Sequence, residues 1–424
     1  MTDLKIAIIG AGSPYTPELI EGLARFKDEL PVREIALMDV DERRLEIMLG
    51  FCRRFAEHLG LKVVFKATTD RREAILGAEF INAQIRVGGN AARVLDEKIP
   101  LKYGVIGQET TGAGGFMKAL RTIPVMLDIA RDVENYSSDA WIINYTNPTG
   151  LVAEAVSKYT GAKIAGLCAG GMRPRLRVAK ALGVDPEKVR YDYIGLNHMN
   201  FAFNFTVDGR PLTQEEFDRA AGAVETVDAE LVRKLKLMPS SYMQYYFHTS
   251  RKLKDFQQSR HTRGEQVLML EKEIFEAYSD PQRHTKPEAL EKRGGGGYSE
   301  VALGVMRAIH NDEDKWMVVN VPNKGALKIL PDDAVIETGC LINRSGIKPL
   351  AIGEVPPAVW GLICAVKNYE QLAVEAAVKG DKDLALFALM AHPLVRDYDI
   401  AKPLLEELLE ANKKYLPQFF KNDA

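Results

Sequence analysis

Short apolar stretches alternate with amphipathic stretches along the first half of the chain. We predict strands at residues 5–9, 34–38, 63–65, 80–85, 141–144 and 164–167. Between several of them, apolar residues recur at helical spacing, as at residues 16–26 and 42–59. This alternation predicts a mostly parallel sheet covered by helices, which is an α/β fold.

The pattern changes after about residue 189. Strand-like stretches at 191–194, 201–207, 316–320 and 335–341 are separated by a charged, helix-rich stretch at 214–279. The end of the chain, from Pro357, is strongly helical. The glycine run at 294–297 could be a flexible linker or a loop that approaches a ligand. We therefore predict an α/β domain at 1–188 and an α+β domain at 189–424 that packs on it.

The composition excludes several classes of protein. The 424 residues carry a formal net charge of −2, and no basic stripe favours nucleic acid as a partner. The four cysteines are too few for a disulfide scaffold, which is typical of a reducing compartment. No apolar stretch approaches the roughly 20 residues of a membrane helix, and no signal peptide precedes the first strand. We expect a cytoplasmic protein without a membrane partner.

A glycine pair follows the first strand directly. Gly10, Gly12 and Ser13 form a turn that lets the backbone approach a pyrophosphate at the next helix N-terminus. Asp39 ends the second strand, where its carboxylate can accept hydrogen bonds from ribose and repel a 2′-phosphate. The third glycine of the usual fingerprint is replaced by Tyr15. The pattern favours NAD over NADP, although a plain strand–helix turn could have the same glycines.

Polar clusters follow other predicted strands, at the edge where open α/β sheets bind ligands. One begins at Arg86 and reaches Arg93, another is the stretch 107–112 that contains Glu109, and a third at 144–148 contains Asn147. Each could be an ordinary turn or a solvated surface. Their repetition at one edge favours a ligand site.

Two further residues could bind a metal. Cys168 closes the strand at 164–167, and His198 follows thirty residues later. A thiolate and an imidazole suit a borderline transition metal, and two ligands leave positions open for substrate. A buried structural cysteine or a Cys–His nucleophile pair would fit the same residues.

The segment 242–246 is rich in tyrosine and could be aromatic core on a helix. Tyr242 could instead carry a proton, but a phenol with a pKa near 10 needs a neighbouring cation to act as a base. Arg263 could supply that charge, or be an ordinary surface arginine.

Taken together, these motifs resemble glycoside hydrolase family 4 over nearly the full chain, most closely its 6-phospho-β-glucosidases and 6-phospho-α-glucosidases. The resemblance is carried by segments 99–112, 144–148, 195–198, 242–246 and 261–263. It implies a Rossmann-like NAD domain related to lactate and malate dehydrogenases, with an appended substrate domain. It also implies NAD and a divalent metal, manganese being expected, as cofactors of an NAD-dependent glycosidase.

The resemblance assigns roles to individual residues. Cys168 and His198 would bind the metal, and Tyr242 would remove the C2 proton of the sugar. Arg93, Asn147 and Arg263 would contact the substrate; the role of Glu109 is left open. The implied reaction oxidises C3 of the sugar with NAD, which acidifies C2, expels the aglycone, adds water and returns the hydride.

The chain departs from the family beside Cys168. The α-specific phosphoglucosidases have an aspartate there that protonates the leaving group, whereas this chain has Ala169, which cannot donate a proton. We therefore expect a 6-phospho-β-glucoside as substrate. The alternatives are another sugar, such as a galactoside or uronide, a dehydrogenase of the lactate/malate type, and a catalytically silent NAD sensor. We expect a homodimer or homotetramer, as is general in the family.

Overall fold

The computed structural model describes residues 4–294 and 296–420. Within these residues nine strands form the main sheet, in the order β13-β12-β11-β6-β5-β4-β1-β2-β3. The strands are β1 (Leu4–Ile9), β2 (Val32–Met38), β3 (Val64–Thr68), β4 (Phe80–Ala83), β5 (Trp141–Asn144), β6 (Lys163–Gly166), β11 (Lys315–Pro322), β12 (Val335–Asn343) and β13 (Gly346–Pro349). The short strand β13 was not predicted.

The first six strands are parallel and confirm the α/β prediction. Their order, 3-2-1-4-5-6, is that of dinucleotide-binding folds, with the change of direction between β1 and β4. Ile9 at the end of β1 pairs with Met38 of β2. Gly10 and Asp39 therefore leave the sheet side by side, at the carboxyl edge where such sheets bind ligands.

The second half of the chain extends the same sheet. Strand β11 pairs antiparallel with β6 through Asn320 and Gly166, and β12 and β13 continue outward from it. The three added strands belong to the domain predicted at 189–424. The predicted boundary between the two domains, at residue 188, stays a prediction. A separate antiparallel sheet contains β7 (Val189–Leu196), β8 (Met199–Val207), β9 (Arg210–Pro211) and β10 (Met238–Pro239).

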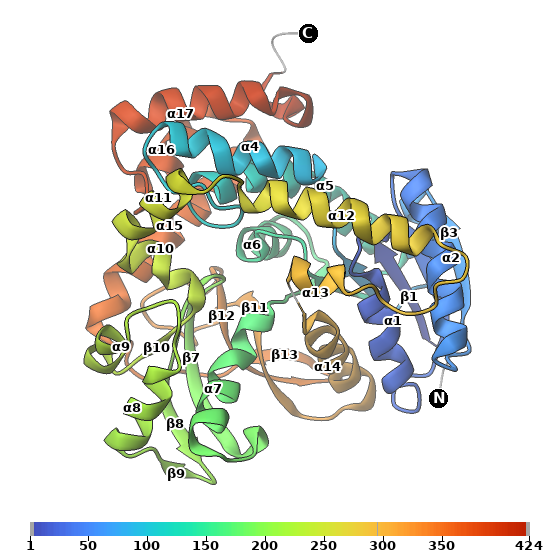
Figure 1. The fold of residues 1–424 in the computed structure, drawn as a ribbon, viewed down its shortest axis with the longest axis horizontal. Coiled ribbons are helices and arrows are strands. Elements are labelled where there is room, and N and C mark those ends of the chain that lie inside the picture. The colour runs from blue at the N-terminus through green and yellow to red at the C-terminus, as the bar shows by residue number, and fades with distance from the viewer. Residues whose placement is uncertain (1–3, 295, 421–424) are drawn as a thin grey trace.

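Helices cover the sheet and build the rest of the molecule. Those of the first half are α1 (Thr16–Arg25), α2 (Glu42–His58), α3 (Arg71–Ile75), α4 (Gly89–Lys102), α5 (Gly112–Tyr136), α6 (Thr149–Tyr159) and α7 (Arg173–Leu182). Those of the second half are α8 (Gln214–Gly222), α9 (Ala229–Leu235), α10 (Gln244–Phe247), α11 (Thr249–Gln258), α12 (Arg263–Ser279), α13 (Ala289–Arg293), α14 (Tyr298–Asn311), α15 (Pro357–Lys379), α16 (Lys382–Ala391) and α17 (Tyr398–Ala411). Helix α12 lies beside α4, and α14 lies beside α1 (Figure 1). The two halves of the chain are thus interleaved.

Helix α2 illustrates how the sequence pattern becomes structure. The Asp41 side chain accepts a hydrogen bond from the Arg44 backbone N–H and caps the helix. The predicted apolar stripe, which includes Leu45, Met48 and Cys52, is buried against the sheet side of the molecule. The helix ends one residue before the predicted boundary.

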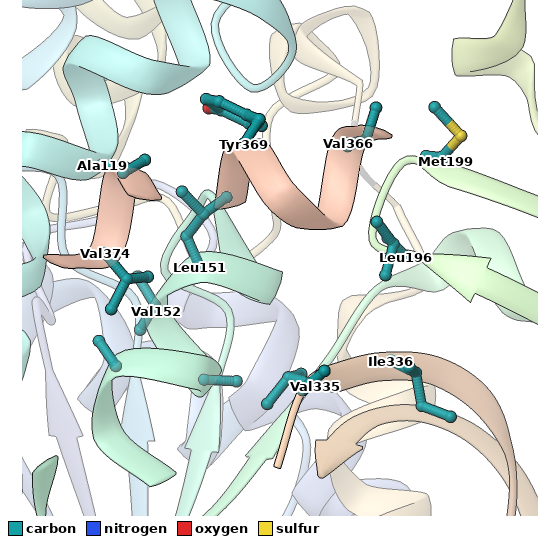
Figure 2. Packing of buried hydrophobic residues seen from close by; sticks show 14 of the residues in the cluster. Ala119, Leu151, Val152, Leu196, Met199, Val335, Ile336, Val366, Tyr369 and Val374 are labelled. Atoms are coloured by element: carbon teal, nitrogen blue, oxygen red, sulfur yellow. The ribbon is translucent and has the colours of Figure 1, made fainter. Parts of the chain in front are cut away.

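A large apolar core joins the two halves. Leu151 and Val152 of α6, Val335 of β12 and Tyr369 and Val374 of α15 belong to one buried cluster (Figure 2). Burial of such side chains contributes roughly 1.5–3 kcal/mol each. Residue 295, within the glycine run at 294–297, lies outside the described residues. Whether the run is a linker or a loop that approaches a ligand stays open. Within the described ranges, no helix has the length and apolar character to cross a bilayer.

Candidate active site

One large cavity, of about 840 Å³, opens at the carboxyl edge of the parallel strands. Eight of the ten predicted site residues line it: Gly10, Gly12, Ser13, Asp39, Arg93, Asn147, Tyr242 and Arg263. They come from six separate elements or loops spread over 250 residues of sequence. The two that do not line it are Cys168 and His198, and the ring of His198 stacks on that of Tyr242, which does line it.

The turn after β1 matches a close approach of backbone and ligand. Gly10 has φ +89°, and a Cβ on it would lie 2.9 Å from the Gln84 carbonyl oxygen. The Gly12 N–H donates to Asp39 Oδ2 at 2.7 Å, and a Cβ on Gly12 would lie 2.8 Å from the same oxygen. Both positions therefore require glycine. The cradle fits an extended, phosphate-containing ligand such as a dinucleotide.

A carboxylate with three cationic partners lies in the cavity wall. Glu109 pairs with Arg86 at 2.6 Å, Arg93 at 3.0 Å and Lys118 at 3.0 Å. Burial by itself would raise the pKa of Glu109, but these three cations hold it well below its usual value. Burial lowers the pKa of Lys118 to about 7, with the charge of Arg86 acting in the same direction. These four side chains carry a net positive charge whether or not Lys118 is protonated, because two arginines face one carboxylate.

Arg93 and Arg263 are held differently. Arg93 is buried and also pairs with Glu97 at 2.8 Å. Arg263 is the first residue of α12, which begins with a capping box between Thr262 and Glu265. Its guanidinium is exposed and donates to the backbone carbonyls of residues 292 and 293. One arginine is therefore fixed in the wall of the cavity, and the other bridges two segments at its rim.

Tyr242 lies in a short 3-10 helix (Ser241–Met243) and stacks on His198. The two ring centroids are 3.8 Å apart and the planes differ by 15°. His198 lies in the turn between β7 and β8 with φ +65°, an uncommon conformation for a residue with a side chain. Burial lowers its pKa to about 3, so the imidazole is neutral at physiological pH.

Cys168 lies two residues after the end of β6 and is the N-cap residue of a 3-10 helix (Ala169–Met172). Its Sγ accepts a hydrogen bond from the Gly170 N–H at 3.4 Å. Burial and the nearby Glu337 carboxylate raise its pKa to about 12, so that the thiol by itself is protonated.

The structure brings the segments of Cys168 and His198 together. Asn197, the residue before His198, hydrogen-bonds to the Cys168 thiol, and the charge of Arg173 acts on both side chains. The buried Nδ1 of His198 has no hydrogen-bond partner, as a nitrogen reserved for a ligand would. A neutral imidazole and a thiol that loses its proton on metal binding are donors that suit a borderline transition-metal ion.

By themselves, Cys168 and His198 would supply only two ligands to a metal ion. Among the residues that the structure describes, no group of three or more His, Cys, Asp and Glu side chains could hold a metal ion. A cation at Cys168 and His198 would need ligands from outside the protein, which the open cavity permits. The residues present therefore fit a metal that also contacts a bound molecule.

Sequence reasoning missed several residues of the site. Lys118 and Arg121 are the two charged side chains in the otherwise mostly apolar first half of α5, and their isolation was an available signal. Glu337 interrupts the apolar stretch predicted at 335–341 in the same way. Its partners Asn200 and Asn320 gave no signal, because asparagines are common in turns and their contacts depend on the tertiary fold.

Comparison with known proteins identifies the family. The sequence family described as family 4 glycosyl hydrolase matches residues 5–184, and its C-terminal domain matches residues 193–395. The 6-phospho-beta-glucosidase of Escherichia coli (strain K12) is 39% identical, over 98% of this chain and 97% of its own. These matches over the whole length support the predicted glycosidase against a dehydrogenase.

Solved structures of similar proteins agree with this family assignment. The 6-phospho-beta glucosidase from Thermotoga maritima, solved with manganese, NAD+ and glucose-6-phosphate, superimposes with a TM-score of 0.90 at 35% identity, covering 97% of this chain and 99% of that one. Malate dehydrogenase from Plasmodium falciparum, at 15% identity and a TM-score of 0.55 over 90% of this chain and 99% of its own, shares the fold. The predicted relation to malate dehydrogenases is thus confirmed for the fold. The chain belongs to family 4 of the glycosyl hydrolases.

Proposed function

We propose that this glycosidase hydrolyses 6-phospho-β-glucosides with NAD and a divalent metal ion, manganese, as cofactors. The observation that carries the proposal is the single cavity that joins the dinucleotide turn at Gly10 and Gly12 to Tyr242, Arg93 and Asn147. A nicotinamide and a sugar bound in it would be neighbours, as a redox step on the sugar requires.

Gly10, Gly12, Ser13 and Asp39 would hold NAD, and Cys168 and His198 would hold the metal. When bound, NAD accepts a hydride from the sugar and the cation acts as a Lewis acid towards oxygens of the same sugar. The chain's own residues bind, orient and deprotonate the substrate.

Tyr242 is the proposed proton acceptor at C2 of the sugar. The stack with His198 fixes the plane of the phenol, so that its oxygen keeps one direction relative to the cavity. Arg93, immobilised by Glu97 and Glu109, and Asn147 would bind sugar hydroxyl groups, and Arg263 would close the rim over the substrate. Such fixed contacts lower the entropic cost of reaching the reactive geometry.

The charge of the cavity supports a phosphorylated substrate. Arginine and lysine side chains outnumber carboxylates among the lining residues, seven to five. An uncharged glycoside would gain nothing from this excess, whereas a phosphate dianion would. A β-linked glucoside is favoured because Ala169, next to Cys168, offers no proton to a leaving group. A galactoside or uronide is the alternative.

We further propose that the protein is cytoplasmic and forms a homodimer or homotetramer. The cytoplasmic location is supported by four cysteines that are all free. The oligomer rests on the family resemblance alone, and light scattering of the purified protein would test it.

A panel of nitrophenyl α- and β-glycosides, each with and without a 6-phosphate, tests the substrate. With NAD, manganese and a thiol reductant present, release of nitrophenol should be greatest from 6-phospho-β-glucoside. Turnover of an unphosphorylated sugar or a uronide, without turnover of phosphorylated ones, would refute the proposal.

A second measurement tests the cofactors. Activity should disappear on treatment with a chelator and return with manganese, while no net NADH accumulates over many turnovers. Stoichiometric NADH would indicate a dehydrogenase instead. Undiminished hydrolysis by protein stripped of NAD and metal would exclude the cofactor-dependent reaction.

A further inference from the structure

Glu337 is a buried carboxyl group without a cationic partner in the described part of the chain. It is the third residue of β12 and is fully inaccessible to solvent. A carboxylate in such a place is costly unless it accepts several hydrogen bonds. The reason for its presence must lie in the groups that it contacts.

Three asparagine side chains donate hydrogen bonds to this carboxyl group. Asn197 Nδ2 and Asn320 Nδ2 each donate to Oε1 at 3.2 Å. Asn200 Nδ2 donates to Oε2. Asn200 and Asn320 are themselves buried. One carboxyl group therefore joins β12 to two other segments, one 17 residues away along the chain and the other 137 to 140 residues away.

Two of these asparagines flank His198. The turn between β7 and β8 contains Asn197, His198 and, just beyond it, Asn200. The Asn200 amide also donates to the Leu196 carbonyl at 3.2 Å and so ties the two ends of the turn together. Residues on both sides of His198, whose backbone has a positive φ, are thus hydrogen-bonded to Glu337.

The third asparagine leads to Cys168. Asn320 pairs with Gly166 across β11 and β6, and its amide also donates to the Gly166 carbonyl at 3.1 Å. Contact here is tight, because a Cβ on Gly166 would lie 2.8 Å from the Asn320 Cβ. Gly166 is the last residue of β6, and Cys168 follows two residues later.

We infer that Glu337 is a positioning residue that fixes the strand end of Cys168 and the turn of His198 relative to each other through Asn320, Asn197 and Asn200. This inference rests on the proposed function, in which the two side chains hold the metal. Metal ligands are commonly oriented by outer hydrogen-bond partners, and loss of such a partner weakens metal binding by about 10- to 100-fold.

The test compares metal binding by Glu337→Gln and by the unmodified protein. Gln has the same shape but replaces one acceptor oxygen by a donor that faces an asparagine N–H. Cobalt(II) is the probe, since a thiolate bound to it gives a charge-transfer band in the near ultraviolet. We expect Glu337→Gln to weaken cobalt binding about 10- to 100-fold and to shift the band. NAD binding, measured by fluorescence, should stay unchanged and report that the fold is intact.

Thr338→Val is the matched control. Thr338 is the next residue of the same strand, is equally buried, and donates to the Tyr193 carbonyl at 3.0 Å instead of to the asparagines. Its loss should lower thermal stability without changing cobalt affinity or the band. If Glu337→Gln does not fold, Asn200→Ala, which removes one amide from the same network, carries the same expectation.

Cys168→Ser separates the two levels of the proposal. If this variant loses the band and Glu337→Gln binds cobalt as tightly as the unmodified protein, the positioning role is overturned while the metal site stands. If Cys168→Ser keeps both the band and the affinity, the metal site itself is wrong and the inference falls with it. A loss in Thr338→Val equal to that in Glu337→Gln would also overturn the inference, because any damage to β12 would then suffice.

Discussion

His198 and Tyr242 lie face to face, with ring centroids 3.8 Å apart. The candidate metal ligand and the candidate proton acceptor therefore share one contact, although they lie 44 positions apart in the sequence. A ring that stacks on a neutral, buried imidazole has little freedom to rotate. The phenol oxygen is thereby held in the cavity before substrate binds.

Replacing Tyr242 by Phe separates these two functions of the ring. Tyr242→Phe keeps the stack on His198 but removes the oxygen that would accept the C2 proton. We expect kcat to fall by about 10²–10⁴-fold, while cobalt and NAD affinities stay unchanged. The expected loss is also visible by NMR, since exchange of the C2 hydrogen with heavy water should cease.

Tyr245→Phe is a suitable control for this experiment. Its ring packs edge-on against that of Tyr242, with the two ring centroids 6.2 Å apart. Burial raises the pKa of its phenol to about 12. Loss of this hydroxyl should affect kcat far less. If Tyr242→Phe retains the kcat of the unmodified enzyme, Tyr242 is not the base.

The turn at Gly12 permits a second prediction. Gly12→Ala would place a methyl group 2.8 Å from Asp39 Oδ2 and displace the carboxylate. We expect NAD binding to weaken about 10- to 100-fold, equivalent to about 1.4–2.8 kcal/mol, when measured by fluorescence titration. Gly361→Ala is the control, because Gly361 lies exposed in α15 with open space around it. Equal NAD affinity in both variants would show that the Gly12 turn does not contact the dinucleotide.

The Glu109 cluster predicts non-additive changes in stability. Glu109→Gln leaves Arg86, Arg93 and Lys118 without their shared carboxylate, and we expect the free energy of unfolding to fall by about 3–5 kcal/mol. Adding Lys118→Met removes one of the three cations, a buried one, and should restore part of the loss. Urea denaturation of the two single variants and the double variant measures this coupling. Strictly additive losses would mean that Glu109 and Lys118 do not depend on each other.

The parallel half of the sheet could be predicted from the sequence because its signals are local. Strands and helices alternate there, and each predicted strand end lies within about three residues of the observed one. The glycine turn and Asp39 were found for the same reason, since adjacent parallel strands necessarily end at one edge.

The rest of the fold depends on contacts between distant segments. Strand β11 pairs with β6 through Asn320 and Gly166. No pattern in the sequence of either strand predicts that the two strands are neighbours. The same holds for Glu337. Its charge within an apolar strand can be recognised in the sequence, but the three asparagines that donate hydrogen bonds to it cannot. The residue types of Cys168 and His198 left a metal site open among several alternatives, and the family resemblance then assigned both residues to the metal.

Burial of His392 makes the free energy of unfolding depend on pH. This imidazole is fully buried against Tyr369, and two backbone N–H groups, of Gly112 and Leu394, point at its ring nitrogens. Burial lowers its pKa from 6.5 to about 3. Between these values the unfolded chain binds a proton that the folded chain does not, so the free energy of unfolding must fall as the pH falls from 6.5 towards 3. Each such group contributes about 1.4 kcal/mol per pH unit, hence about 2 kcal/mol between pH 7.5 and pH 5.

His392→Gln removes this one titrating group and should therefore lose about 2 kcal/mol less stability than the unmodified protein when the pH is lowered from 7.5 to 5. Urea denaturation at both pH values measures the difference. His198, whose pKa burial also lowers to about 3, contributes the same slope to both proteins and cancels in the comparison. Identical losses in the two proteins would mean that His392 takes up its proton in the folded state as readily as in the unfolded chain, which its dry surroundings should prevent.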